Sequence, residues 1–256
     1  MLKWMLVLCC WPLWSLAGEE PEPLSEIVSQ PVSAVVVAKA PAPVGHPVNL
    51  NAYVARYEVR YNGLKVGELK QQLSVKFGGQ QSLQTAAKTT GVVALVKSDE
   101  VFESSLWREV AGELQPLSYI YRYTGRSEDI VDRLDFDWVS GKAKSLHDGQ
   151  VTELAVKHGT YDRHMYQVVL RYALLSGEKQ ISYPVVDKGE LQTYEFEVLA
   201  EERVETDKFG PLNCLKVKKG TTRIWVAREF DYLPIKIEKE EDGTTVGTYL
   251  IELTGG

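Results

Sequence analysis

From Tyr53 onward, apolar and polar residues alternate over most of the chain. The stretch "AYVARYEVRYNGLKVGELKQQLSVKF" holds Asn62-Gly63 between two alternating runs, which is typical of a tight β-hairpin. We expect Tyr61 to oppose Leu64 across this turn. After Gly67 the apolar positions change parity, as they do at a β-bulge. The pattern therefore predicts strands that bend, as in a curved sheet or a barrel.

The same alternation continues to the end of the chain. It predicts further strands near residues 82–88, 101–110, 114–124, 128–139, 142–147, 150–156, 180–186, 190–203, 212–219 and 222–227. The last ribbon, "IWVAREFDYLPIKIEKEEDGTTVGTYLIEL", turns at Asp242-Gly243, so Glu241 should oppose Thr244. Pro234 cannot donate to a ladder, which suggests a strand start or a sheet edge.

One segment has helical spacing instead. In "TYDRHMYQVVLRYALLSG" apolar residues recur three and four positions apart, from Met165 to Leu175. Thr160 or Asp162 can cap the start of this helix, and Gly177 ends it. "GVVALVKS" is compatible either with a further strand or with a helical turn. We therefore expect a mainly β fold: a curved antiparallel sheet, either barrel or half-barrel, with one principal α-helix packed on it.

The first 50 residues follow another pattern. Lys3 precedes an apolar run that ends at Leu16, and small and then acidic residues follow, as in a secretory signal peptide. Because the run is too short to span about 30 Å of hydrocarbon, we expect cleavage after residue 17 and no stable transmembrane anchor. Six of the eleven prolines lie in residues 18–50, which predicts a proline-rich flexible arm. Residues 51–256 then form a single β-rich domain.

Two alternatives remain open for this region: a retained membrane anchor, and a short strand at Ser33–Ala40 that docks on the domain. The signal peptide predicts export to the periplasm. Its removal takes Lys3 away, so the formal charge changes from -6 to -7 (-6 - 1). An acidic chain without a basic stripe argues against a nucleic-acid partner.

Cleavage also removes Cys9 and Cys10, which leaves Cys214 as the only cysteine and excludes an intrachain disulfide. Its setting, "LNCLKV", is typical of a strand, and this favours a small buried hydrophobe over a reactive thiol. The motifs of the common enzyme classes are missing from the sequence: there is no Gly-x-Ser-x-Gly, phosphate loop, dinucleotide fingerprint or His-Glu-x-x-His. We predict no catalytic residues, no cofactor and no metal site.

Four polar residues remain as candidates for chemistry. Asp135 and Asp137 share a strand face and could hold calcium or act as a glycosidase pair, although a solvated face balanced by Arg133 explains them better. Asp162 precedes His164 by two residues and could tune its basicity. A helix cap beside a surface histidine explains this pair better. Three turn residues are interpreted as chance placements: His147, Asp148 and His158.

Aromatic side chains are candidates for the wall of a ligand pocket. Tyrosine combines an apolar body with a polar tip, which suits a pocket but also an ordinary core. Tyr119, Tyr121 and Tyr123 should point to one face of their strand. The candidates for the pocket are Tyr57, Tyr61, Tyr119, Tyr121, Tyr123, Trp225 and Tyr249.

Four segments resemble a known family when taken in order: "YEVRYNGLKVG", "GTYDRHMYQVVLRYALL", "ETDKFGPLNCLKV" and "IWVAREFDYLPIKIE". They are similar to the exported Gram-negative proteins of the domain of unknown function 3108 family, over about residues 53–253. Members of that family have an acidic residue at the start of the helix, which Asp162 resembles. They also have a strand with a tryptophan followed by leucine–proline, which Trp225 and Leu233-Pro234 resemble. The family usually has small residues after that acidic residue, and His164-Met165 departs from this pattern. The resemblance implies an exported, β-rich protein with no assigned activity.

Together these features predict a non-enzymatic periplasmic protein that binds a hydrophobic or amphipathic ligand, or an envelope protein, in the concavity of its sheet. At the level of the fold it resembles the periplasmic half-barrels that carry lipoproteins. Two alternatives are an envelope-assembly module that uses strand edges and the proline-rich arm, and a cell-wall hydrolase. The hydrolase would need at least two of the four polar candidates in one cleft.

Overall fold

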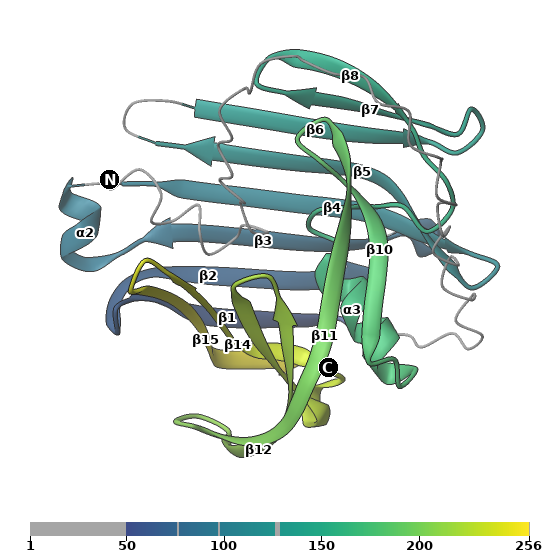
Figure 1. Cartoon of the computed structure of the whole chain (residues 1–256). Coiled ribbons are helices and arrows are strands. Elements are labelled where there is room, and N and C mark those ends of the chain that lie inside the picture. Colours follow the sequence, from purple (N-terminus) through teal and green to yellow (C-terminus); the bar gives the residue numbers. More distant parts are fainter. Residues whose placement is uncertain (1–49, 76, 97, 126–128, 256) are drawn as a thin grey trace, which may run out of the picture.

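A computed structural model of the chain describes residues 50–75, 77–96, 98–125 and 129–255. The predicted signal peptide and all of the proline-rich arm except its last residue, Leu50, lie outside these residues. The described residues form one open sheet of 15 strands, strongly curved and antiparallel at every pairing but one (Figure 1). This confirms the mainly β fold and the curved antiparallel sheet.

The sheet consists of two meanders that meet at the first and last strands. The first meander contains β1 (Tyr53–Tyr61), β2 (Leu64–Val75), β3 (Gln81–Thr89), β4 (Glu100–Val110), β5 (Glu113–Thr124), β6 (Asp129–Asp137), β7 (Lys142–His147) and β8 (Gln150–Ala155). The second contains β9 (Tyr161–Asp162), β10 (Gln180–Asp187), β11 (Glu190–Thr206), β12 (Gly210–Lys219), β13 (Thr222–Ala227), β14 (Leu233–Glu241) and β15 (Thr244–Gly255). β1 pairs with both β2 and β15, so residues far apart in sequence lie side by side in the middle of the sheet.

The predicted hairpin registers are confirmed. Tyr61 opposes Leu64 across a turn in which Asn62 and Gly63 both have positive φ, and Glu241 opposes Thr244. The register between β1 and β2 shifts next to Gly67, where the parity change predicts a bulge. Such bulges increase the local twist, and this lets a sheet of many strands curl instead of extending flat.

Pro234 marks a strand start and not an edge. β14 lies between β13 and β15, and Pro234 pairs with Val226 where the register of β13 shifts after Trp225. The missing amide of proline is therefore accommodated at a bulge inside the sheet, which is one of the few places where a ladder tolerates it.

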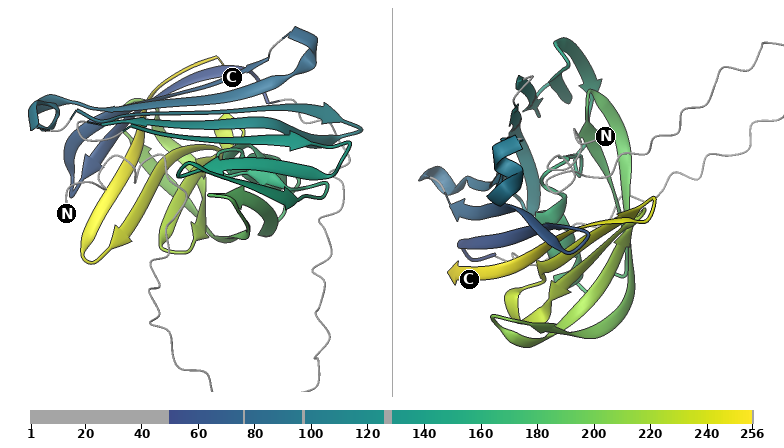
Figure 2. Two further views of the ribbon diagram at one scale, coloured as in Figure 1. Left: turned by 90° about the horizontal axis from the view of Figure 1, so that it is seen from above. Right: turned by 90° about the vertical axis from the view of Figure 1, so that its left-hand side faces the viewer.

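The two ends of the sheet curve toward each other (Figure 2). The turn between β10 and β11 reaches the opposite end, because a Cβ on Gly189 would lie 3.4 Å from the hydroxyl of Thr152 on β8. Lys188 and Gly189 both have positive φ in this tight turn. β9 in turn contacts β5. The terminal strands β8 and β9 are thus not hydrogen-bonded to each other, but the two ends of the sheet pack close together.

Two α-helices occur in the described residues, α2 (Gly91–Val96) and α3 (Tyr166–Leu175), together with short 3-10 turns at Phe77–Gly79 and Arg228–Phe230. Neither is long and apolar enough to cross a bilayer. α3 lies in the concave side of the sheet (Figure 1) and is buried almost all round, at Val168, Val169, Leu170, Arg171, Tyr172, Ala173 and Leu174. The expectation of one principal helix is therefore only partly met.

α3 starts later than its sequence pattern predicts. The Asp162 carboxylate accepts from the amides of His164 and Met165 at 2.9 Å each, and this forms a turn ahead of the helix. Met165 is the N-cap and makes no side-chain cap, while the Thr160 hydroxyl accepts from the amide of Lys157. The expected capping roles of Thr160 and Asp162 are wrong. Residues 161 and 162 instead form the short strand β9, which pairs with β10, so the helix begins later.

Cys214 lies on β12 with 1% of its surface exposed, as its setting predicts. Burial raises the pKa of its thiol to about 11. Because the thiolate is the reactive form, we expect iodoacetamide to leave the native protein unmodified and to label it fully in urea. Mass spectrometry of the intact chain measures both states. Native labelling as fast as that of glutathione would contradict this placement.

Candidate functional site

The connection between β9 and α3 carries three consecutive polar residues into the interior of the sheet. Asp162, Arg163 and His164 are each no more than 2% exposed. Their partners come from inward positions of strands in the first meander and from β10. The prediction of a surface histidine is therefore wrong, because the chain leading to α3 runs through the core and not over it.

His164 lies in a directional hydrogen-bond chain. The Ser105 hydroxyl donates to the Asp162 carboxylate at 2.7 Å, so it can only accept from His164 Nδ1 at 3.1 Å. His164 Nε2 then accepts from the Thr85 hydroxyl at 2.8 Å. Thr85 in turn accepts from the Gln71 side-chain amide at 3.5 Å. This chain places a proton on Nδ1, and a neutral imidazole is then the acceptor at Nε2.

The titration behaviour agrees with that assignment. Burial, reinforced by the charge of Arg163, lowers the pKa of His164 to about 3. Burial also raises the pKa of Asp162 to about 6, against the hydrogen bonds from Ser105 and from the two backbone amides that favour the carboxylate. At neutral pH the pair therefore consists of a neutral histidine and an ionised aspartate.

These residue types match a Ser-His-Asp arrangement, but their geometry opposes nucleophilic catalysis. Ser105 is 0% exposed and donates its proton to the aspartate, so its oxygen is neither accessible nor activated. His164 is too weak a base, and Thr85 already occupies its other nitrogen. Two of the four polar candidates do meet, as the hydrolase alternative requires, but they meet in a sealed core.

Arg163 forms a second buried cluster beside the first. Its guanidinium lies 3.5 Å from Glu103 and 3.1 Å from Asp187, and it donates to the Tyr119 hydroxyl at 2.6 Å. Tyr119 donates to Glu103, also at 2.6 Å. Burial raises the pKa of Glu103 to about 7, against the charge of Arg163. The cluster ties β4, β5 and β10 to the start of α3.

Sequence reasoning missed most of these partners, although it had one usable signal. Glu103 and Ser105 occupy inward positions of β4, between Val101 and Trp107, where the alternation calls for apolar residues. Polar residues at core positions require a partner, so their place in the alternating pattern by itself indicates a buried network.

The other two polar candidates lie elsewhere. Asp135 and Asp137 are on the exposed face of β6, as the preferred interpretation predicts. Asp137 accepts from the amides of Val139 and Ser140, so it caps the following turn. They share no cleft with Asp162 and His164, since those residues lie on the inner side of the sheet.

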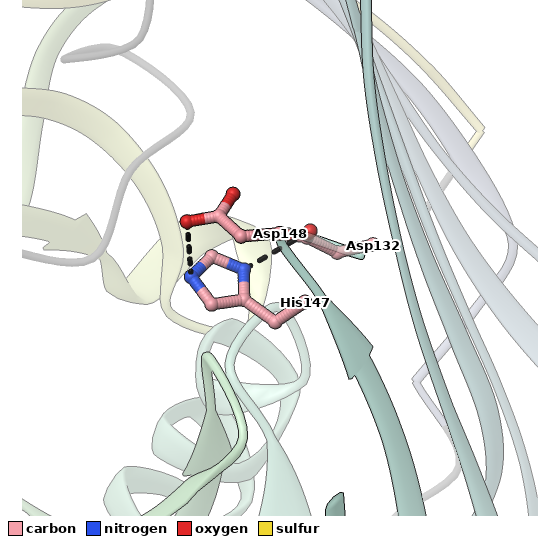
Figure 3. Close-up of side chains that lie close together, drawn as sticks. All are labelled: Asp132, His147 and Asp148. Carbon is pink, nitrogen blue, oxygen red and sulfur yellow. Dashed lines mark ion pairs between the residues drawn. The ribbon is translucent and has the colours of Figure 1, made fainter. Parts of the chain in front are cut away.

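His147 and Asp148, which the sequence pattern indicates as chance placements in turns, are in contact. His147 lies 3.0 Å from Asp132 and 3.5 Å from Asp148, measured between ring nitrogens and carboxylate oxygens (Figure 3). His158 is separate from them and lies 3.1 Å from Glu113.

The aromatic pocket candidates divide between the two faces of the sheet. Tyr119, Tyr121 and Tyr123 are buried on the inner face, as their alternation predicts. Tyr57 is also buried, and Tyr61 is partly buried against the same core; the Tyr57 hydroxyl donates to the Pro234 carbonyl. The structure therefore does not collect the candidates around one cavity.

Trp225 and Tyr249 lie on the outer face among charged side chains. The Lys236 ammonium lies 4.2 Å from the Trp225 ring centroid, and the indole nitrogen donates to Glu202 at 2.7 Å. Tyr249 donates to Glu238 at 2.7 Å. These contacts satisfy both aromatic residues within the protein.

A groove of about 650 Å³ crosses β15 and β1 to β5. Most of the side chains that line it alternate with buried core residues, so they project from the outer face. The apolar side chains on this outer face are Ala86, Phe102 and Ile251; the core residues Tyr57, Leu69, Ala87 and Val101 also border the groove. The charged ones are Arg56, Glu68, Lys70, Lys88, Glu100, Arg122 and Glu252.

The charges of this outer groove are only partly paired. Arg56 lies 3.5 Å from Glu252, and Glu68 lies 2.9 Å from Lys65. Within the described part of the chain, none of the remaining three cations, Lys70, Lys88 and Arg122, forms an ion pair. The groove therefore presents three cations that form no ion pair, beside an apolar floor and one further acidic side chain, Glu100; the charge of Lys88 also acts on Glu68, its neighbour across the strand pair.

Comparison with known proteins gives a family and a fold. The family model described as "Protein of unknown function (DUF3108)" matches residues 56–254, and none of the curated proteins matches the chain by sequence. Among solved structures, a β-barrel-like protein of domain of unknown function DUF1849 from Brucella abortus is similar with a TM-score of 0.50 and 12% identity, over 82% of this chain and 99% of that one. A candidate lipoprotein from Parabacteroides distasonis gives a TM-score of 0.26 and 10% identity over 79% and 95%. The Brucella structure supports a barrel-like fold.

Proposed function

The chain belongs to the DUF3108 family of proteins of unknown function, and from that premise we propose that it is a non-enzymatic binding protein of the periplasm. Its ligand is an anionic amphiphile held in the outer groove. The observation that carries this proposal is the combination, in one groove, of an apolar floor with the three unpaired cations Lys70, Lys88 and Arg122.

The position of α3 favours the outer groove over the concavity that the sequence suggests as the binding site. Met165 and Leu170 are both 0% exposed, and the Tyr166 ring stacks on Phe196 of β11 at a centroid distance of 5.8 Å. A ligand on the inner face would have to displace this packing and the polar clusters around Asp162 and Arg163. The outer groove needs no such rearrangement.

The ligand class follows from the lining. An acyl chain can cover Ala86, Phe102 and Ile251, each methylene contributing up to about 0.8 kcal/mol when it leaves water. A carboxylate or phosphate head group can then pair with the cations, of which arginine is the most suited to bidentate contacts. A lipid, or an acylated segment of an envelope protein, carries both parts.

The proposal predicts that charge reversal in the groove weakens binding of such a ligand. The double variant Lys88→Glu with Arg122→Glu should bind oleate at least roughly tenfold more weakly, a change of about 1.4 kcal/mol, because repulsion replaces attraction at the head group. Titration of the full chain with a fluorescent fatty acid, displaced by oleate, measures this. Both side chains are exposed, so the fold should tolerate the change.

The matched control reverses two exposed cations outside the groove, in the double variant Arg133→Glu with Lys144→Glu. It has the same net charge as the groove variant. Equal binding by the two variants would reject the groove as the site, and absence of saturable binding by the natural chain would reject this ligand class.

A second function is favoured by the edge of the sheet. β8 is a terminal strand, and Val151 on it is 58% exposed. An extended segment of an envelope protein can add to such an edge through backbone hydrogen bonds. Proline substitutions at alternate positions of β8 should abolish capture of this partner and leave oleate binding unchanged.

A further inference from the structure

Three side chains from one end of the first meander converge near the seam of the sheet. Asp132 comes from an inward position of β6, His147 ends β7, and Asp148 begins the β7–β8 turn with a φ of 48°. One potential ligand atom from each lies within 4.8 Å of the other two (Figure 3). Neighbouring strands and a tight turn hold all three, so little movement is needed to close them around an ion.

The contact between Asp132 and His147 is not a hydrogen bond. The Asp132 side chain is 10% exposed, and its Oδ1 lies 3.0 Å from His147 Nδ1. Both atoms are fully buried, yet neither has a hydrogen-bond partner. Leaving such a group unsatisfied costs about 1–3 kcal/mol, so its presence calls for an explanation. Two ligands of a common ion approach each other in this way, because each directs its lone pair at the ion and not at the other ligand.

We propose that Asp132, His147 and Asp148 form a binding site for a divalent transition-metal ion, with Zn²⁺ as the best-suited ion. An imidazole nitrogen with two carboxylates suits zinc and its neighbours, whereas Ca²⁺ and Mg²⁺ prefer oxygen alone. Three protein ligands leave a fourth position for water or for a ligand atom from elsewhere. This site is independent of the outer groove, since Asp132 and His147 lie on the inner side.

Lys188 should compete with a bound metal ion for the carboxylates of the site. Lys188, in the β10–β11 turn that crosses the seam, interacts electrostatically with both Asp132 and Asp148. Bound metal and protonated Lys188 neutralise the same carboxylates. Metal affinity should therefore increase when the lysine is removed.

Calorimetric titration of the chelator-treated full chain with Zn²⁺ tests the site. We expect one saturable ion that Asp132→Asn and His147→Gln each weaken by at least about tenfold. Because these two positions are buried or partly buried, the exposed Asp148→Asn provides a variant that should fold normally. Asp135→Asn, on the outer face of the same strand as Asp132, is the matched control and should bind like the natural chain.

Two further readouts separate a metal site from a structural cluster. Lys188→Met should bind Zn²⁺ several-fold more tightly, and bound Co²⁺ should give the visible absorption of a site with a nitrogen ligand, lost in His147→Gln. The proposal is overturned if no single site saturates, or if Asp132→Asn and Asp148→Asn bind like Asp135→Asn. It is equally overturned if binding disappears only in His158→Gln, which would place the ion beside Glu113.

Discussion

Replacing Arg163 with methionine should lower the free energy of unfolding by about 3–5 kcal/mol. The substitution removes the guanidinium that pairs with Glu103 and with Asp187, whose side chains are 1% and 4% exposed. Two carboxyl groups then remain in the core without that counter-charge, and Tyr119 loses a donor at 2.6 Å. Urea unfolding followed by tryptophan fluorescence measures the loss, which corresponds to a Tm lower by roughly 10 °C.

Two further variants test whether the loss comes from the buried charges. Arg133→Met removes an exposed arginine from the outer face of β6 and should change stability by no more than about 0.5 kcal/mol. Adding Glu103→Gln to Arg163→Met should recover part of the loss, since it removes one of the two uncompensated acids. A loss below about 1 kcal/mol in Arg163→Met would mean that the cluster around Arg163 does not hold the start of α3.

The second large effect is on the pH dependence of stability, and His164 is responsible for it. The pKa of this histidine is lowered from 6.5 to about 3 in the fold, because burial disfavours its charged form. The unfolded chain therefore binds a proton below pH 6.5 that the folded chain rejects. The natural protein should lose up to about 4 kcal/mol as the pH falls from 6.5 to 3 through this residue. In His164→Gln this loss should disappear, because glutamine cannot be protonated.

Asp162 and Glu103 act in the opposite direction. Burial raises their pKa values to about 6 and about 7, so the folded chain holds these protons more tightly than the unfolded chain. Their contribution is fully present at low pH and is lost as the pH rises through about 4 to 7. In the natural chain the histidine offsets them. In His164→Gln that offset is removed, so acidification from pH 7 to about 4.5 should stabilise this variant relative to the natural chain.

Chemical unfolding of both chains at several pH values measures the difference. His158→Gln, at a side chain that is 63% exposed, is the matched control and should follow the natural profile. Parallel profiles for His164→Gln and the natural chain would show that His164 is not held neutral in the core.

Local patterns predict the strands of this protein well. Observed strands such as β4, at Glu100–Val110, and β13, at Thr222–Ala227, begin and end within a residue or so of the alternating runs. Asn62-Gly63 and Asp242-Gly243 also specify their turns and registers. Alternation and turn chemistry are short-range properties, and neighbouring residues express them whatever the rest of the chain does.

The sites were harder to predict, for a physical reason. Asp132 and His147 are fifteen positions apart, and Ser105 and His164 are fifty-nine apart, so only the pairing of strands and the path into α3 brings each pair together. The same holds for the outer groove, whose lining comes from six strands.

The amino-acid sequence by itself therefore determined the strands, their turns, the buried role of Cys214 and the family. The tertiary structure alone decided that the chain before α3 runs through the core, so that Asp162 and His164 are sealed and not at the surface. It also decided that Tyr119, Tyr121 and Tyr123 lie on the inner face of the sheet, whereas Trp225 and Tyr249 lie on the outer face. Which side of a curved sheet a segment crosses depends on contacts between distant residues, and a local pattern contains no information about those contacts.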